Sequence, residues 1–293
     1  MLLSKKRLVK YMLPMLIISL ISCNDNVKKQ IKSTYNQIVH TNQNNDNDTL
    51  ITNVDSINKL NINQDKIIID STKQYVYLTF DDGPYKGSEK INKIIKEENV
   101  KATVFIVGMN AFTDKLKQNL KEYENNDLIE ISNHTYSHAN RNKFKEYYNN
   151  PDWVLNDVRK NDSIYKFDNR FVRLPGRNVW RLGSMNKDDF DKASKKSSDL
   201  LAQNQYYVFG WDYEWNKISK KHPLSNPEDI YKGIVSRLDN KKTFLDKHLV
   251  ILMHDDMFNN DEDAEKLRLL IRLIKANKNI IFEVASNYPI SLS

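Results

Sequence analysis

The stretch YLTFDDGPYKG, residues 77–87, joins an apolar run to a segment with helical periodicity. The run from Tyr75 to Phe80 is almost wholly apolar, as in a strand that is buried on both faces. Asp82-Gly83 is also a common hairpin turn, but the segment that follows, YKGSEKINKIIKEENV, has a period of 3.6 rather than 2. The stretch therefore predicts a junction between a strand and a helix, with Asp81 and Asp82 beside each other at the end of the strand.

The same alternation of apolar runs and helical patterns continues to the end of the chain. Seven runs predict strands: Tyr75–Phe80, Ala102–Val107, Leu128–Ser132, Phe171–Leu174, Tyr206–Trp211, Leu249–Met253 and Ile280–Val284. Four of the intervening patterns are distinct: residues 91–95, residues 116–123, a helix opened by Asn226-Pro227, and DEDAEKLRLLIRLIKAN. The segment 140–169 is long for one connection and predicts an extra helix around residues 153–158. Seven units indicate an α/β fold with a parallel sheet that closes or nearly closes into a barrel.

The amino-terminal 67 residues differ from the rest. Four basic residues and an apolar stretch precede Leu20-Ile21-Ser22-Cys23, which resembles a bacterial lipoprotein signal, with residues 1–22 removed and Cys23 lipidated. A membrane-spanning helix is disfavoured, because the apolar stretch is short and contains Pro14. Residues 23–67 are rich in polar side chains and predict a flexible tether, with a small accessory subdomain as the alternative. We expect residues 68–293 to form one domain that a lipid anchor holds to a membrane of the bacterial cell envelope.

Composition limits the partners of this domain. The chain of 293 residues has a formal charge of +7, but the four positive charges of the signal leave only +3 on the mature protein. Basic residues are not interleaved with aromatic residues in blocks, so nucleic acid is not an expected partner. Cys23 is the sole cysteine, so an internal disulfide is impossible. We expect a monomer with a core large enough to need no covalent staple.

Polar side chains follow the predicted strands, at the carboxyl ends where parallel barrels place their chemistry. The segment SNHTYSHAN places His134 and His138 four residues apart, close enough to share a metal on one side of a helical turn. RLPG, GWDYEW and LMHDD follow later strands. Ionisable groups therefore gather at one rim: Asp81, Asp82, His134, Arg173, Asp212, Glu214 and His254.

Five of these stretches occur in the order of the five motifs of a known family. TFDDGP, HTYSH, RLPG, WDYEW and LMH resemble the motifs of polysaccharide deacetylases, the NodB-homology domain of carbohydrate esterase family four. The resemblance extends from about residue 68 to the end of the chain. It implies a distorted (β/α)7 barrel that hydrolyses acetyl groups from amino-sugar glycans, with a divalent metal that is usually Zn²⁺, although Co²⁺ or Ni²⁺ can substitute.

The resemblance also implies a role for each matching residue. Asp82, His134 and His138 correspond to the metal ligands, and Asp81 to the general base that takes a proton from the attacking water. Arg173 would pair with Asp81 and keep it ionised. His254 corresponds to the general acid that protonates the leaving sugar nitrogen.

The remaining candidate residues would contact the substrate or tune the acid. The turn at Pro175-Gly176 would supply a backbone N–H to the oxyanion, and Leu252 and Trp215 would line the pocket for the acetyl methyl group. The fourth motif departs from the family, which has a longer spacing between its first aspartate and a final Asp-Trp, whereas the run here is Asp212-Tyr213-Glu214-Trp215. Either acid could orient His254, and we favour Glu214.

Three other functions compete with an N-deacetylase of a GlcNAc-containing envelope glycan. An O-acetyl esterase could use the same site on an acetylated glycan. A lectin-like pseudoenzyme could keep the barrel without turnover, although almost every motif residue is present. A non-haem iron oxygenase uses the same type of ligand set, but usually on an antiparallel fold.

Overall fold

The computed structural model describes residues 69–290, except for 191, 220 and 221, and it describes no side chains over 217–223. The predicted signal peptide, Cys23 and the whole of the predicted tether lie outside the described residues. Within these limits, the helices fall short of the length and apolarity that crossing a membrane requires.

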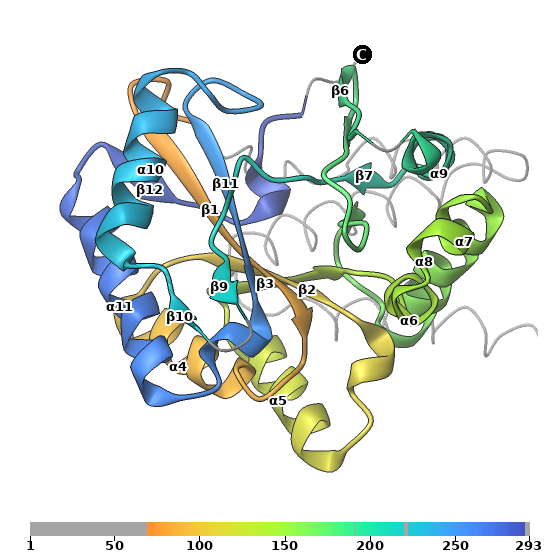
Figure 1. The fold of residues 1–293 in the computed structure, drawn as a ribbon, viewed down its shortest axis with the longest axis horizontal. Coiled ribbons are helices and arrows are strands. Elements are labelled where there is room, and N and C mark those ends of the chain that lie inside the picture. Colours follow the sequence, from red (N-terminus) through yellow and green to blue (C-terminus); the bar gives the residue numbers. More distant parts are fainter. Residues whose placement is uncertain (1–68, 191, 220–221, 291–293) are drawn as a thin grey trace, which may run out of the picture. The chain divides into compact units, whose positions relative to one another are not determined.

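A mainly parallel sheet forms the centre of the domain (Figure 1). All seven predicted runs form strands, which pair in the order β7-β4-β3-β2-β1-β11, with β12 beside the start of β1. Their bounds are β1 Gln74–Gly83, β2 Ala102–Ile106, β3 Ile129–Asn133, β4 Phe171–Val172, β7 Tyr207–Val208, β11 His248–His254 and β12 Ile280–Phe282. All of the pairs among these seven strands are parallel.

Five further strands lie among the described residues. β8 (Tyr213–Glu214) pairs in parallel with β11, while β5 (Trp180–Leu182) and β6 (Met185–Lys187) form an antiparallel extension beyond β7. β9 (Lys217–Ser219) and β10 (His222–Leu224) form a separate antiparallel pair. The sequence patterns did not predict β5, β6, β9 or β10, which have three residues each and do not lie in a longer apolar run.

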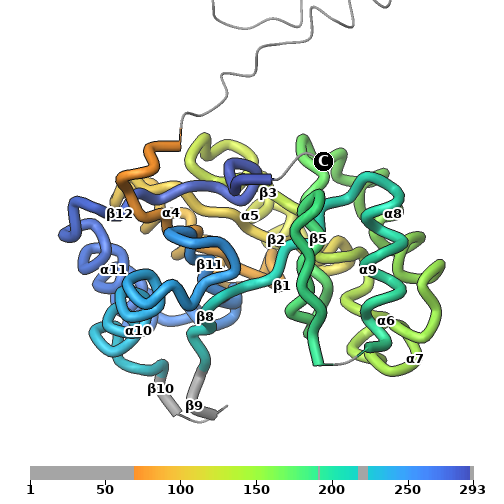
Figure 2. Tube along the Cα trace, turned by 90° about the horizontal axis from the view of Figure 1, so that it is seen from above, coloured from red at the N-terminus to blue at the C-terminus, as the bar shows by residue number. Residues whose placement is uncertain are grey.

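Helices cover the sheet in two groups (Figure 2). α4, α10 and α11 pack together on one side, and α7, α8 and α9 pack together on the other. The bounds are α4 Ser88–Glu98, α5 Asp114–Glu124, α6 His138–Asn142, α7 Phe144–Tyr148, α8 Pro151–Tyr165, α9 Ala193–Gln203, α10 Pro227–Asp239 and α11 Asp261–Ala276. Three short 3-10 helices are η1 Gly108–Asn110, η2 Asp255–Phe258 and η3 Ala285–Asn287.

Capping residues explain where the later helices begin. The side chain of Asn226 accepts a hydrogen bond from the backbone N–H of Glu228, and Pro227 occupies the first helical position, as predicted. Asn260 caps α11 in the same way through the N–H of Asp263, and three acidic residues follow in the first turn. Negative charge there stabilises the helix dipole.

The alternation of side chains along β1 decides which residues face the inside of the sheet. Every second residue from Val76 to Phe80 packs in the core beneath α4, α10 and α11. Tyr75 and Tyr77 point the other way, into an aromatic cluster on the concave side. Asp81 continues this inner row to the carboxyl end of the strand, because its side chain lies an even number of positions from Tyr77.

The sheet curls into an incompletely closed barrel. Buried aromatic rings of the inner cluster, including Trp180, Phe209 and Tyr288, fill its inside. The segment 209–212 connects β4 to β11, which lie toward opposite ends of the curled sheet. The N–H of Phe209 donates to the carbonyl of Val172, and the N–H of Asp212 donates to the carbonyl of Val250. This curled α/β sheet with external helices is the distorted barrel predicted from the sequence.

Candidate active site

The two adjacent aspartates at the end of β1 point in different directions. The register of β1 against β2 shifts between Phe80 and Gly83, and Asp82 adopts a left-handed backbone conformation with φ of 71°. The side-chain amide of Asn110 donates a 2.7 Å hydrogen bond to the carbonyl of Asp82. Asp81 is consequently buried, with 3% of its surface exposed, whereas 26% of the Asp82 side chain is exposed.

His134 follows β3 and is buried beside the RLPG turn. Its Nδ1 lies 2.9 Å from the backbone carbonyl oxygen of Arg173. A carbonyl oxygen can only accept, so Nδ1 carries the proton and Nε2 presents a lone pair. His134 is therefore held in the tautomer that a metal ligand requires.

His138 reaches the same place from an unusual turn. It begins α6, in which the backbone of residues 138–142 has positive φ throughout, so the turn is left-handed. Its Nδ1 lies 2.6 Å from Oδ1 of Asn142, an oxygen that can only accept. The ring therefore also donates through Nδ1 and leaves the Nε2 lone pair free.

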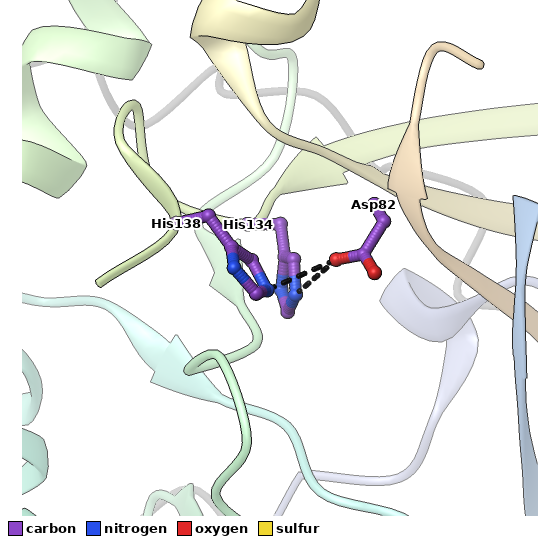
Figure 3. Close-up of side chains that lie close together, drawn as sticks. All are labelled: Asp82, His134 and His138. Carbon is purple, nitrogen blue, oxygen red and sulfur yellow. Dashed lines mark ion pairs between the residues drawn. The ribbon is translucent and has the colours of Figure 1, made fainter. Parts of the chain in front are cut away.

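The three side chains converge on one point (Figure 3). Nε2 of His134 and Nε2 of His138 lie 3.3 Å and 3.0 Å from Oδ1 of Asp82. The three ligand atoms lie within 4.8 Å of one another, and Oδ1 of Asp82 is buried without a hydrogen-bond donor among the described residues. Three ligand atoms that converge in this way form a site suited to a cation.

The electrostatics of the site favour positive charge at this point. Burial by itself raises the pKa of Asp82, but the two imidazoles outweigh burial and hold that pKa well below its ordinary value. Burial lowers the pKa of His138, but Asp82 outweighs it and raises the pKa above the ordinary value. The site thus favours a carboxylate facing positive charge, and two imidazoles with one carboxylate form a common set of zinc ligands.

Asp81 is held by the fully buried guanidinium of Arg173. Nη1 of Arg173 lies 2.8 Å from Oδ1 of Asp81 and 2.7 Å from Oγ1 of Thr79. Nε and Nη2 donate to the backbone carbonyls of Phe209 and Gly210. Burial lowers the pKa of Arg173 and Asp81 partly offsets this, but the guanidinium stays charged because its ordinary pKa exceeds 12. The pair implied by the resemblance is present.

The second carboxylate oxygen of Asp81 faces the three ligand residues. Oδ2 lies 3.7 Å from Nε2 of His134. One oxygen is therefore occupied by Arg173, and the other is directed toward the place where His134, His138 and Asp82 meet. This is the geometry that a base requires if it is to accept a proton at the edge of that site.

His254 lies at the end of β11, directly opposite Asp81 in the register of the two strands. It is half-buried, and its backbone N–H donates to Sδ of Met257 at 3.1 Å. Leu252 is buried two residues earlier and shares the inner face of β11 with His254. Asp81, His254 and Leu252 therefore lie at one edge of the barrel.

Asp212 occupies a different place from the one expected. Its carboxylate accepts hydrogen bonds from the backbone N–H groups of Phe244 at 2.6 Å and Val250 at 2.8 Å. Val250 precedes His254 by four residues, about 13 Å along an extended strand. Burial raises the pKa of Asp212 to about 6, although the two N–H groups stabilise its charge. Asp212 thus holds the start of β11 rather than orienting His254.

The other fourth-motif residues lie nearer to the end of β11. Glu214 is half-buried and opposite Leu252 in the register, which leaves it the candidate partner of His254. Trp215 is fully buried; its ring packs on Phe258 and its Nε1 donates to the carbonyl of Ser225. Its role as a pocket wall remains a prediction.

The RLPG turn lies beside the ligand turn. The hydroxyl of Tyr148 donates to the carbonyl of Pro175 at 2.6 Å. Gly176 is exposed with φ of 64°, and a Cβ there would approach the ring of Phe144 to 3.3 Å. Phe144 in turn packs edge-on against the ring of His138. Gly176 therefore lies near the ligand residues, and its role as an oxyanion donor remains a prediction.

Sequence reasoning missed two groups that shape the site. Asn110 binds the backbone carbonyl of Asp82, and Asn142 binds the ring of His138. Their sequence context does not mark them as site residues, because asparagine is frequent in this chain. Asp255 directly follows His254, is buried, and accepts hydrogen bonds from the hydroxyls of Ser88 and Tyr123. An acidic residue at the end of an apolar strand could have signalled Asp255.

Comparisons with known proteins agree with the motifs. Residues 69–189 match the family model described as polysaccharide deacetylase. A peptidoglycan-N-acetylglucosamine deacetylase of Bacillus cereus is 38% identical over 108 residues, covering 35% of this chain and 36% of the relative. A chitin disaccharide deacetylase of Vibrio alginolyticus is 25% identical over 209 residues, covering 49% of this chain and 48% of the relative. The chain thus spans between a third and a half of the length of these relatives.

Solved structures extend the likeness in fold. The catalytic domain of a peptidoglycan N-acetylglucosamine deacetylase from Eubacterium rectale has a TM-score of 0.54 at 20% identity, covering 77% of this chain and 94% of that domain. A CE4 esterase of Streptococcus mutans has a TM-score of 0.52 at 21% identity, covering 72% and 86%. The matches confirm the predicted fold class over about three quarters of the chain.

Proposed function

We propose that the protein is a metal-dependent hydrolase that removes N-acetyl groups from a GlcNAc-containing glycan of the cell envelope. The observation that carries this proposal is the meeting of Asp82, His134 and His138 beside a buried Asp81–Arg173 pair. Among the described residues this edge of the barrel combines a cation site, a base and an imidazole acid. Those are the groups that amide hydrolysis requires.

The ligand set suits a divalent cation, and Zn²⁺ is the expected one. Asp82, His134 and His138 would hold it, with the hydrogen bonds at each Nδ1 fixing both rings. The ion supplies Lewis acidity toward the acetyl carbonyl and the attacking water. Co²⁺ and Ni²⁺ accept the same ligands and should also support activity.

Asp81 and His254 divide the proton transfers. One carboxylate oxygen of Asp81 is paired with Arg173 and the other is directed at the ligand residues, so Asp81 can accept the proton of the attacking water. His254 lies opposite Asp81 in the strand register and can give a proton to the departing amine. Glu214 is the expected partner of His254.

The substrate is inferred from the relatives. Two of the similar relatives carry names that specify N-acetylglucosamine in peptidoglycan or the chitin disaccharide. An N-acetylated amino sugar in a glycan is their shared chemistry. We therefore favour amide hydrolysis over hydrolysis of an O-acetyl ester.

The site of action follows from the amino terminus. Lipidation of Cys23 would hold the domain at a membrane of the envelope, and residues 24–67 would let it reach its glycan. We expect the domain to act as a monomer there.

An acetate-release panel tests the proposal. The full chain, loaded with Zn²⁺, should release acetate from N-acetylglucosamine oligomers or peptidoglycan and lose this activity with a chelator. Asp81→Asn and His134→Ala should each abolish release. Release from acetylated xylan alone would instead favour the O-acetyl esterase, and a folded, zinc-loaded protein without turnover on the whole panel would favour a glycan-binding pseudoenzyme.

A further inference from the structure

His138 is the more exposed of the two imidazole ligands, and its ring orientation depends on a side chain of its own turn. The side chain of His134 is 2% exposed, whereas that of His138 is 23% exposed. His134 donates to a main-chain carbonyl of the barrel, but His138 donates to the side chain of Asn142, which is itself exposed. The proton on Nδ1 of His138 is therefore held by one side-chain amide, which a substitution can remove.

The turn that carries both residues is left-handed and anchored at its start. The N–H of His138 donates to Oγ1 of Thr135, and the N–H of Arg141 donates to the carbonyl of Ser137. Ser137 is fixed in turn by a 2.8 Å hydrogen bond from its hydroxyl to Asp157. One turn later, Asn142 returns to the side of His138, because residues four apart lie on one face of a helical turn of either hand.

Asparagine suits position 142 for two independent reasons. It tolerates a left-handed backbone better than most residues, and its φ is 68°. Its Oδ1 also supplies an acceptor 2.6 Å from Nδ1 of His138. A neutral imidazole has two tautomers, and only the one with the proton on Nδ1 leaves Nε2 free to bind a cation.

We propose that Asn142 is a positioning residue for the metal site, which selects the tautomer and ring orientation of His138 through its side-chain oxygen. The inference rests on the proposed function, since it presumes that Asp82, His134 and His138 hold Zn²⁺. Partners of this kind change metal affinity by about 10–100-fold when they are removed. The structure assigns that role to a residue outside the five sequence motifs.

The test separates the side chain from the backbone. Asn142→Gly keeps the left-handed conformation accessible and removes the acceptor, while Asn142→Asp keeps both an acceptor and tolerance of positive φ. Asn140→Gly is the matched control, because Asn140 has φ of 52° in the same turn and an exposed side chain. The zinc dissociation constant of each full-length variant is measured by competition with a chromophoric chelator, and the visible spectrum of the Co²⁺ form reports the ligand geometry.

Asn142→Gly should weaken zinc binding by about 10–100-fold, whereas Asn142→Asp and Asn140→Gly should stay within about threefold of the wild type. The Co²⁺ spectrum should change in Asn142→Gly alone. The inference is overturned if Asn142→Gly binds zinc as the wild type does, or if Asn140→Gly weakens binding equally, which would assign the effect to the turn. A wild-type chain that fails to bind zinc would overturn the proposed function, and this inference with it.

Discussion

The buried pair of Asp81 and Arg173 makes a quantitative prediction about stability. Replacing Asp81 by asparagine keeps the size of the side chain and an acceptor for Nη1, but it leaves the guanidinium without a counter-charge in a site that is 0% exposed. Breaking a buried ion pair by removing one partner costs about 3–5 kcal/mol. Because 1 kcal/mol shifts the melting temperature of a domain of this size by about 2–4 °C, Asp81→Asn should melt about 6–20 °C lower.

A double-mutant cycle isolates the pair from its surroundings. Arg173→Met removes the charge and also leaves the carbonyls of Phe209 and Gly210 without their donor. That second loss recurs in the double variant, so it cancels in the cycle. Urea unfolding of the wild type, both single variants and the double variant should give a coupling energy of about 2–3 kcal/mol.

The same variants separate a catalytic loss from a loss of folded protein. Acetate release is assayed at a temperature at which the melting curve shows Asp81→Asn to be folded. Turnover should be absent there, since an amide cannot accept the proton of water. A coupling energy below about 0.5 kcal/mol would refute the stabilising pair, and undiminished turnover in Asp81→Asn would refute the base.

Four further predictions follow from single groups. Zn²⁺ at a thousandfold excess over its dissociation constant should raise the free energy of unfolding by about 4 kcal/mol, and Asp82→Asn or a chelator should remove this gain in a melting assay. Burial raises the pKa of Asp255 from 3.8 to about 7. Between about pH 4 and pH 7 the carboxyl ionises in the unfolded state and stays protonated in the folded state, so the free energy of unfolding should fall as the pH rises. Asp255→Asn does not titrate, so its free energy of unfolding should rise relative to the wild type over that range, by up to about 4 kcal/mol in urea titrations. Arg141→Gly should raise the free energy of unfolding by about 0.5–1 kcal/mol by relieving a left-handed residue, while Lys93→Gly in the right-handed helix α4 should lower it by about 1 kcal/mol. Cys23→Ala should move the protein from the membrane pellet to the supernatant after cell fractionation.

The strands and helices that the sequence predicted lie in apolar runs or helical patterns that extend over several residues. β1 and β11 are buried on both faces, so their residues read as continuous apolar runs, and α11 shows sixteen residues of regular pattern with acids at its start. The hairpin of β5 and β6 has only three residues in each strand and no such period. A sequence pattern thus predicts a strand or helix more reliably when the pattern extends over more residues.

The site was predictable where a residue is tied to the end of a strand. Asp81, Arg173 and His254 take their direction from strand alternation, which is fixed once the strands are known. Asp212 fails this reasoning, because β8 spans only Tyr213–Glu214 and the chain before it crosses between the two sides of the sheet. The position of its carboxylate is set by hydrogen bonds from the backbone N–H groups of Phe244 and Val250, and not by strand alternation.

The spacing of His134 and His138 predicted a shared face of one helical turn, and the structure brings the rings together by another route. His134 extends β3, and His138 opens a left-handed turn that includes Ala139 and Arg141, residues for which this conformation costs about 1–2 kcal/mol each. Sequence propensity argues against such a turn, so it forms only because its neighbours over-determine it. The hydrogen bonds of Ser137 at its start and of Asn142 at its end supply that constraint, and the bond of Asn142 also fixes the ring of His138. The hydrogen bond between His138 and Asn142 therefore stabilises the strained turn and also orients the ring. The motif HTYSH ends before Asn142, so neither feature could be inferred from the motif alone.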